Sequence, residues 1–192
     1  MRIISGSLGG RRFDAPKGHR THPMSEKVRG GLFSALGDIE GLTVLDAFAG
    51  SGALSFEAVS RGAEHATSID IDKNAVKTIT DNVKQLKIND KIKSVRANSG
   101  GWSDNNPEQK FDLILCDPPF DQLKITLLQK LAKHLAPTGI FVVNIPGGLH
   151  PFELKGLSII KQKNYGDSML IFYKPLTKTR EPYSRQNYKN IL

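Results

Sequence analysis

From residue 42 onward, short apolar runs alternate with segments whose hydrophobic positions recur at helical spacing. The apolar runs predict strands at 42–46, 65–70, 91–97, 111–117 and 139–145. The helical spacing predicts helices at 52–61, 73–87 and 122–135, with a less regular stretch around 100–109. Strands that alternate with helices in this way form a parallel sheet with helices on both faces. The fold class predicted from the pattern is therefore α/β.

The last part of this pattern departs from the alternation. Two further strands are predicted at 157–163 and 168–173, and Asn164-Tyr165-Gly166-Asp167 between them is typical of a turn. We expect these strands to form an antiparallel pair at one end of the sheet.

A different pattern precedes residue 42. Residues 2–5 and 11–14 are extended candidates separated by glycine-rich residues 6–10, which predicts a β-hairpin. A helix should begin after Ser25, whose hydroxyl can cap it. Its apolar face would consist of Val28, Leu32, Phe33 and Leu36. This hairpin and helix form a predicted N-terminal arm.

The charge is concentrated at the two ends of the chain. The chain has 27 Lys and Arg against 19 Asp and Glu, a net charge of +8. We divide it into an arm (1–40), a main domain (41–174) and a basic tail (175–192). Arm and tail cations could both lie against phosphates, since clustered cations bind polyanions by releasing counterions. On charge alone, a merely soluble basic surface remains an alternative.

The cysteine count and hydropathy favour a cytoplasmic protein. Cys116 is the single cysteine, so the chain cannot form an internal disulfide or a thiolate metal cluster. No apolar run approaches the roughly 20 residues of a membrane span, and the start lacks a signal core. We expect no membrane partner, no metal and a monomer. Cys116 itself is expected to be a buried small side chain.

The loop after the first predicted strand is the first candidate site. Asp46-Ala47-Phe48-Ala49-Gly50-Ser51-Gly52 lies where an open parallel sheet binds ligands. Gly50 and Gly52 allow a tight turn and a close approach. A dinucleotide fits poorly, because Ser55 replaces the third fingerprint glycine and Asp46 would face a pyrophosphate. S-adenosylmethionine (SAM) has an amino group and no phosphate, so a carboxylate there favours SAM.

Two later strands end in residues that suit the same cofactor. Asp70 follows Gly50 by twenty residues, where a carboxylate can accept both ribose hydroxyls. Asn98 could hydrogen-bond the adenine amine. Helix capping by Asp46 and Asp70, and a turn role for Asn98, remain alternatives, while Asp72 is expected to be a cap. The predicted cofactor residues are Asp46, Phe48, Ala49, Gly50, Ser51, Gly52, Asp70, Ile71, Asn98 and Asp117.

The fourth predicted strand ends in Asp117-Pro118-Pro119-Phe120, the candidate catalytic segment. Its prolines offer carbonyls without N–H donors, so the segment is a rigid acceptor surface beside a carboxylate. If Asp117 and the Pro118 carbonyl accept both hydrogens of a base amine, the amine lone pair can point at the SAM methyl group. Phe120 offers a face for stacking the base. The alternative is a simple strand terminator.

These motifs resemble a known family. The loop at 46–52 and the segment at 117–120 look like motifs I and IV of amino-methylating SAM enzymes. The arm resembles that of the RsmD family of bacterial 16S ribosomal-RNA guanine-N2 methyltransferases. The arm residues that carry this resemblance are Arg2-Ile3-Ile4-Ser5-Gly6, Gly10-Arg11-Arg12, Pro23, Val28-Arg29 and Leu32-Phe33; later matches are Ser60-Arg61-Gly62-Ala63 and Tyr165-Gly166-Asp167-Ser168.

The resemblance implies a Rossmann-like seven-stranded sheet, SAM as methyl donor, and methylation of one guanine N2 in 16S rRNA. The partner would be the small ribosomal subunit or an assembly intermediate. Arg2, Arg11, Arg12 and Arg29 are the predicted RNA-binding residues. His22 and Gly30 depart from the family pattern. The tail, with Tyr183 and Tyr188 among its cations, is longer than usual.

Two other functions fit parts of the sequence. A DNA adenine-N6 methyltransferase faces the same lone-pair problem and uses similar tetrapeptides, but the chain has no evident separate DNA-recognition domain. A non-catalytic nucleic-acid-binding module would need neither the glycine loop nor the Asp117 segment. We therefore expect rRNA guanine methylation ahead of both alternatives.

Overall fold

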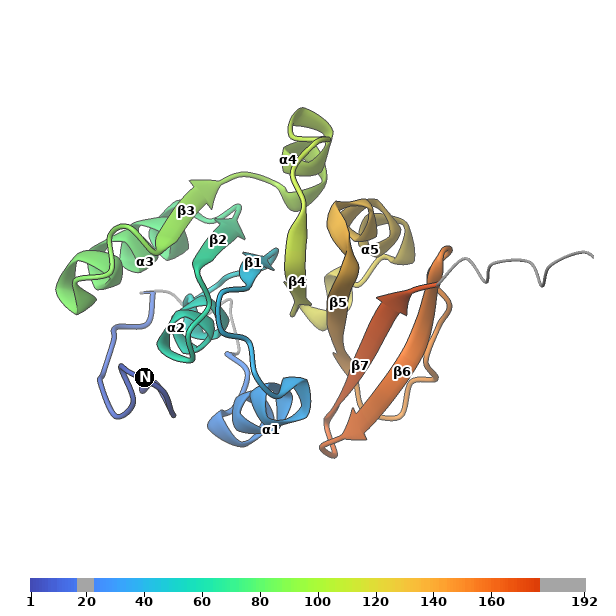
Figure 1. Cartoon of the computed structure of the whole chain (residues 1–192), viewed down its shortest axis with the longest axis horizontal. Helices are drawn as coiled ribbons and strands as arrows, with labels where there is room; N and C mark the ends of the chain where they lie inside the picture. Colours follow the sequence, from blue (N-terminus) through green and yellow to red (C-terminus); the bar gives the residue numbers. More distant parts are fainter. Residues whose placement is uncertain (17–22, 177–192) are drawn as a thin grey trace, which may run out of the picture.

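Seven strands form a single sheet in the order β3-β2-β1-β4-β5-β7-β6 (Figure 1). The computed structural model describes residues 1–16 and 23–176. The strands are β1 (Thr43–Asp46), β2 (His65–Asp70), β3 (Ile92–Arg96), β4 (Phe111–Cys116), β5 (Leu135–Pro146), β6 (Leu157–Asn164) and β7 (Ser168–Pro175). The helices are α1 (Glu26–Leu36), α2 (Ala53–Ser60), α3 (Lys73–Leu86), α4 (Ser99–Asn105) and α5 (Ile125–Leu131), with 3-10 turns η1 (Phe120–Gln122) and η2 (Ala132–His134).

The pairing pattern confirms the predicted architecture. Strands β1 to β5 pair in parallel, whereas β7 pairs antiparallel with both β5 and β6. The result is the Rossmann-like α/β fold with a seven-stranded, mostly parallel sheet. The sequence order reverses between β1 and β4, and an open α/β sheet binds its ligands at such a point.

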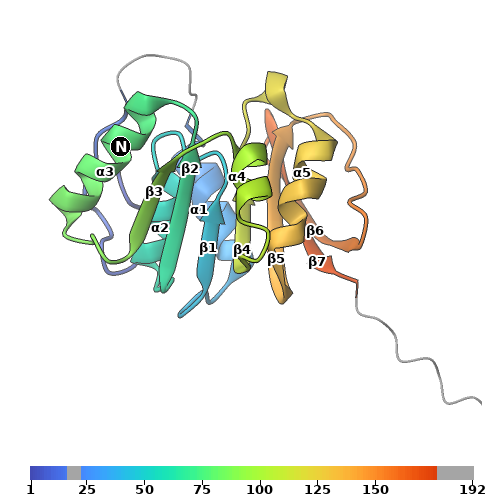
Figure 2. The ribbon, with the colours of Figure 1, turned by 90° about the horizontal axis from the view of Figure 1, so that it is seen from above.

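Helices cover both faces of the sheet and bury two separate hydrophobic cores (Figure 2). One core joins α1, α2 and α3 to the strand side chains of one face, such as Val44 of β1. The other joins α4 and α5 to the opposite face, which includes Leu45. Successive side chains of a strand point to opposite faces, so both cores draw on the same apolar runs.

Three element predictions were wrong in detail. Residues 99–105, in the stretch expected to be irregular, form α4, because Asn98 caps its first turn and Trp102 packs into the core. The helix expected at 122–135 is broken into η1, α5 and η2. Strand β5 begins at Leu135 rather than 139, and its register with β4 shifts between the pairs Phe111–Leu135 and Leu113–Ile140, with the extra residues on β5.

The predicted hairpin is reduced to one antiparallel bridge, between Arg2 and Arg12. Next to this bridge, Ile3 N–H donates to the Arg11 carbonyl at 3.0 Å and Gly10 N–H donates to the Ile3 carbonyl at 2.9 Å. Other N–H groups of the segment bond to α2. Ile4 and Ser5 donate to the Glu57 carboxylate at 2.8 and 3.1 Å, and Leu8 donates to the Ser60 hydroxyl at 2.9 Å. The predicted hairpin is therefore short, and tertiary hydrogen bonds to α2 hold the rest of the segment. Helix α1 begins as predicted, with the Ser25 hydroxyl accepting from Val28 N–H.

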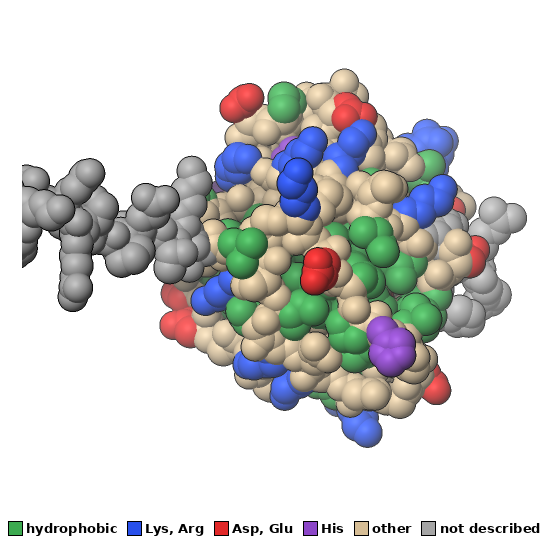
Figure 3. Space-filling model, turned by 90° about the vertical axis from the view of Figure 1, so that its right-hand side faces the viewer, with side chains coloured by type: hydrophobic (Ala, Val, Ile, Leu, Met, Phe, Trp, Pro, Cys, Tyr) green, Lys and Arg blue, Asp and Glu red, His purple; other side chains and the backbone are tan. Residues whose placement is uncertain are grey.

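Strand β6 is an edge of the sheet, on the face seen in Figure 3. It exposes Ile159 and Ile160, and Lys161 follows them. The register with β7 shifts between Ile159 and Lys161. A bulge and exposed lysines both disfavour pairing of an edge with another chain. Among the described residues, none of the helices has the length and apolar character to cross a membrane.

The buried Glu57 carboxylate generates a stability prediction. It contacts Arg61 Nε at 2.8 Å and Arg29 Nε at 3.6 Å, besides the two arm N–H groups. Glu57→Ala leaves Arg29 buried without its counter-ion, so we expect a loss of about 3–5 kcal/mol in unfolding free energy by urea denaturation. The exposed Glu64→Ala should change it by less than about 0.5 kcal/mol. Equal losses would contradict this role of Glu57.

Candidate active site

The carboxyl ends of β1 and β4 meet at one edge of the sheet. Asp46 ends β1 and pairs in register with Leu115 of β4, so Asp117 stands two residues beyond that level. Side chains two residues apart on a strand share a face. Asp46 and Asp117 therefore lie on the same face, and the charge of Asp117 acts on Asp46. The structure thus brings the cofactor loop and the catalytic segment together.

Asp70 holds the glycine loop in place. Its Oδ2 accepts from Gly50 N–H at 2.7 Å, and its Oδ1 accepts from Asp72 N–H at 2.8 Å. Gly52 adopts a left-handed φ of 79°, and a Cβ there would lie 2.9 Å from the Phe56 ring. A carboxylate has about four acceptor positions, so Asp70 keeps capacity for ribose hydroxyls. This contact between Asp70 and the loop was not predicted from the sequence.

Asp46 is fully buried below the loop. Its Oδ2 accepts from the Ser55 hydroxyl at 2.8 Å, and Ser55 also hydrogen-bonds Ser68 at 2.7 Å. Its Oδ1 has no partner among the described residues. Burial raises the pKa of Asp46 to about 7, and the negative charges of Asp117 and Asp70 act in the same direction. A cationic ligand would relieve this concentration of negative charge.

Asp117 is the first residue of the catalytic segment. Its Oδ1 accepts from Asn144 Nδ2 of β5 at 2.8 Å. Burial raises the pKa of Asp117 to about 6, although the hydrogen bond from Asn144 lowers it. Pro118 is buried, whereas Phe120, at the start of η1, is 45% exposed. The ring of Phe120 is therefore accessible to a base.

The remaining cofactor candidates differ in their surroundings. Ile71 is 66% exposed next to Asp70, and Phe48 is half-buried. Ala49 and Ser51 are buried in the loop. Asn98 caps α4, because its Oδ1 accepts from Gly100 and Gly101 N–H at 3.0 and 3.2 Å. Its contact with adenine stays a prediction. Asp72 caps α3 as expected.

One predicted RNA contact has to be corrected. Arg29 is 1% exposed, and its guanidinium donates to the Arg2 carbonyl and lies 3.6 Å from Glu57. It therefore binds the arm to α2 and does not face RNA. Arg11 bonds the carbonyls of Leu86 and Gln85 at the end of α3.

The three other predicted arm contacts, Arg2, Arg11 and Arg12, are all on the surface. Arg2 is exposed and pairs with Glu26 at 2.6 Å. Arg12 is exposed, and no ion pair or side-chain hydrogen bond of Arg12 occurs within residues 1–16 and 23–176. His22 and the tail residues after Leu176 lie outside the described residues.

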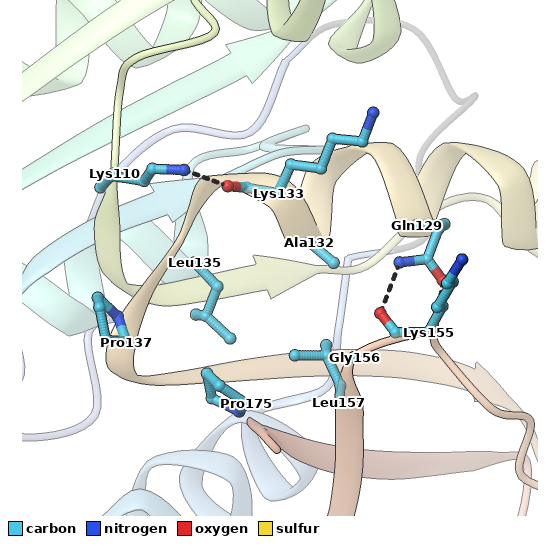
Figure 4. Close-up of a pocket in the computed structure, with 10 residues that line it drawn as sticks. All are labelled: Lys110, Gln129, Ala132, Lys133, Leu135, Pro137, Lys155, Gly156, Leu157 and Pro175. Atoms are coloured by element: carbon cyan, nitrogen blue, oxygen red, sulfur yellow. Dashed lines mark hydrogen bonds between the residues drawn. The ribbon is translucent and has the colours of Figure 1, made fainter. Parts of the chain in front are cut away.

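A separate pocket lies where the parallel strands begin, at the opposite edge (Figure 4). It has a volume of about 320 Å³, and its walls include Leu135 and Leu157, the first residues of β5 and β6. Lys110, Lys133 and Lys155 surround it. None of the predicted site residues lines this pocket.

Comparison with known proteins identifies the family. A family described as "Conserved hypothetical protein 95" matches residues 1–174. The chain belongs to this family. It is the RsmD family, as the motifs indicated.

Family relatives share the fold and most of the chain. "Putative rRNA methyltransferase YlbH" of Bacillus subtilis is 33% identical over 181 residues, which cover 91% of this chain and 98% of that protein. "Ribosomal RNA small subunit methyltransferase D" of Escherichia coli K12 is 35% identical over 122 residues, 62% of this chain and 60% of its own length. The solved "Putative methyltransferase yhhF" of Escherichia coli has a TM-score of 0.79 at 29% identity and covers 91% of this chain and 97% of its own.

The buried Asp46 predicts a pH-dependent stability. Its pKa rises from 3.8 to about 7 on folding, so between about pH 4 and 7 the folded chain holds a proton that the unfolded chain releases. Raising the pH through this window therefore lowers stability. In the ligand-free protein, Asp46→Asn removes this effect and should be more stable above pH 7 by roughly 2–4 kcal/mol.

The measurement is urea denaturation of wild type and variant from pH 4 to pH 8. The difference should grow with pH and level off near pH 7. For Asp117→Asn it should level off near pH 6. If the difference in unfolding free energy between wild type and Asp46→Asn were the same at pH 4 and pH 8, ionisation of the buried Asp46 would not destabilise the fold.

Proposed function

We propose that this chain transfers a methyl group from SAM to the N2 amine of one guanine in 16S rRNA, within the small ribosomal subunit or an assembly intermediate. The observation that carries the proposal is the position of Asp117 with its rigid proline segment, directly beside the carboxylate-rich loop at Asp46. Relatives named as rRNA methyltransferases support the substrate class.

The residues at the loop fit SAM. When bound, SAM supplies an electrophilic methyl group on a positively charged sulphur. Asp46, Asp70 and Asp117 create a negative region that suits a cationic ligand, and the unpartnered Asp46 Oδ1 leaves an acceptor for an amino group or a bridging water. Asp70 would bind the ribose, and the exposed Ile71 would contact the adenine ring.

The catalytic segment would organise the amine. Asp117 and the Pro118 carbonyl would accept the two amine hydrogens, which frees the nitrogen lone pair from the ring and directs it toward the methyl group. Phe120 would stack on the base once the base has been flipped out of the RNA helix. The methylated nitrogen must then lose a proton. An Asp117 carboxylate with a pKa near 6 is a suitable acceptor close to neutral pH.

The test of this function is transfer of labelled methyl from SAM to small ribosomal subunits that lack their native base methylations. Free 16S rRNA and duplex DNA are compared, and the products are separated as nucleosides. We expect labelled N2-methylguanosine from the ribosomal substrates. Labelled N6-methyladenine in the DNA instead would replace the proposed substrate with adenine.

Asp117→Ala is the matched variant in this assay. It should lower turnover by at least about 100-fold while the dissociation constant of SAM stays within about twofold, because positioning of the amine is lost but the loop is intact. Asp121→Ala removes an exposed carboxylate of η1 and should have little effect. Loss of turnover and SAM binding together would assign Asp117 to the cofactor site instead.

Arg12 is the arm cation that best fits a phosphate contact, since it is exposed and, within residues 1–16 and 23–176, makes no ion pair or side-chain hydrogen bond. Arg12→Ala should weaken binding of the ribosomal substrate and reduce the slope of log K against log salt by about one. Binding is measured by filter retention from 50 to 300 mM salt, roughly the range over which such slopes are resolved. Lys133→Ala, at the opposite edge, is the control. An unchanged slope in Arg12→Ala would remove Arg12 from the interface.

A further inference from the structure

Asn144 is a buried polar residue beside the catalytic segment. It interrupts the apolar run Phe141–Ile145 of β5 and is 6% exposed. Cys116 pairs in parallel register with Val143, so the next residues, Asp117 and Asn144, are cross-strand neighbours. Asn144 Nδ2 donates to Asp117 Oδ1 at 2.8 Å. The Asp117 carboxylate is thus held by β5, the neighbour of β4 on the side away from β1.

The chemistry fixes which end of the amide faces Asp117. An ionised carboxylate only accepts hydrogen bonds, so the NH₂ group of Asn144 must point toward it. The Oδ1 of Asn144 is then left buried, with no partner among the described residues. A buried acceptor without a donor destabilises a protein by about 1–3 kcal/mol. A hydrophobic side chain such as those of Val142 and Ile145 would avoid this penalty.

The presence of a polar side chain that lowers stability and contacts the Asp117 carboxylate is best explained by a role in the active site. We propose that Asn144 is a positioning residue, whose amide fixes the orientation of the Asp117 carboxylate toward the substrate amine. This inference rests on the proposed amine methylation. It adds a residue of β5 to a site whose other predicted residues lie at the ends of β1, β2, β3 and β4.

The electrostatics around Asp117 agree with this geometry. Asp46 at the end of β1 and the neutral Cys116 thiol on β4 are the neighbouring titratable groups. Burial raises the pKa of Asp117, whereas the donor from Asn144 lowers it. Without Asn144, the carboxylate would be protonated at a higher pH and would lose acceptor strength. Asn144 therefore favours both the orientation and the charge state that amine binding requires.

The test uses Asn144→Leu, which is close in volume and removes the amide donor. We expect kcat to fall roughly 10-fold to 100-fold at neutral pH, because misplaced groups slow transfer by such factors. The acidic limb of the kcat–pH profile should move to higher pH. The dissociation constant of SAM should stay within about twofold, and the melting temperature should stay equal or rise, since an unpaired polar group is removed.

Asn106→Leu is the matched control. Asn106 is a half-buried amide at the end of α4 that donates to the Trp102 carbonyl, away from the catalytic segment. Its loss should leave kcat and the pH profile unchanged. An Asn144→Leu variant with wild-type kcat and pH profile would overturn the proposal. A variant with lower kcat, weaker SAM binding and a lower melting temperature would also overturn it, because that outcome indicates a structural role.

A second measurement separates this inference from the proposed function. The ¹³C resonance of the Asp117 carboxyl carbon is titrated in wild type and Asn144→Leu without any substrate. The pKa of Asp117 should be higher in the variant by about one unit. An unchanged titration would overturn the role of Asn144 even if the enzyme methylates rRNA. A raised pKa together with no methyl transfer in wild type would refute the proposed function alone.

Discussion

The parallel pairing of β4 between β1 and β5 is the constraint on which the site depends. It places Asp46, Asp117 and Asn144 on one face at the same edge of the sheet, although almost 100 residues separate the first from the last. Backbone hydrogen bonds set the relative height of the three side chains. A register shift of one residue would turn the shifted strand's side chain to the opposite face.

That arrangement is unfavourable for the ligand-free protein. Burial raises the pKa of both Asp46 and Asp117, and two polar oxygens, Asp46 Oδ1 and Asn144 Oδ1, are buried without partners among the described residues. Such unsatisfied groups concentrate where proteins bind ligands or carry out reactions. The hydrophobic cores on both faces of the sheet supply the stability that offsets this strain.

The N-terminal arm depends on a second buried charge, Glu57 of α2. Its carboxylate accepts from the backbone of Ile4 and Ser5 and contacts Arg29 and Arg61. Gly31 allows the Tyr165 hydroxyl to approach α1, since a Cβ there would lie 1.9 Å from it. The arm is therefore fixed to the same face of the sheet that carries Asp46 and Asp117.

The sequence by itself determined the strand and helix alternation, the glycine loop and the Asp117 segment, because these depend on local periodicity and backbone geometry. Tertiary structure decided what depends on contacts between distant residues. Arg29 looked like an RNA contact but is paired with Glu57, and the hairpin is only a short pairing around Arg2 and Arg12 that also bonds to α2. Asn144 was visible only as one polar residue in an apolar run. Its role required the register of β4 and β5, because a strand pattern shows which face a residue occupies but not which neighbour it meets.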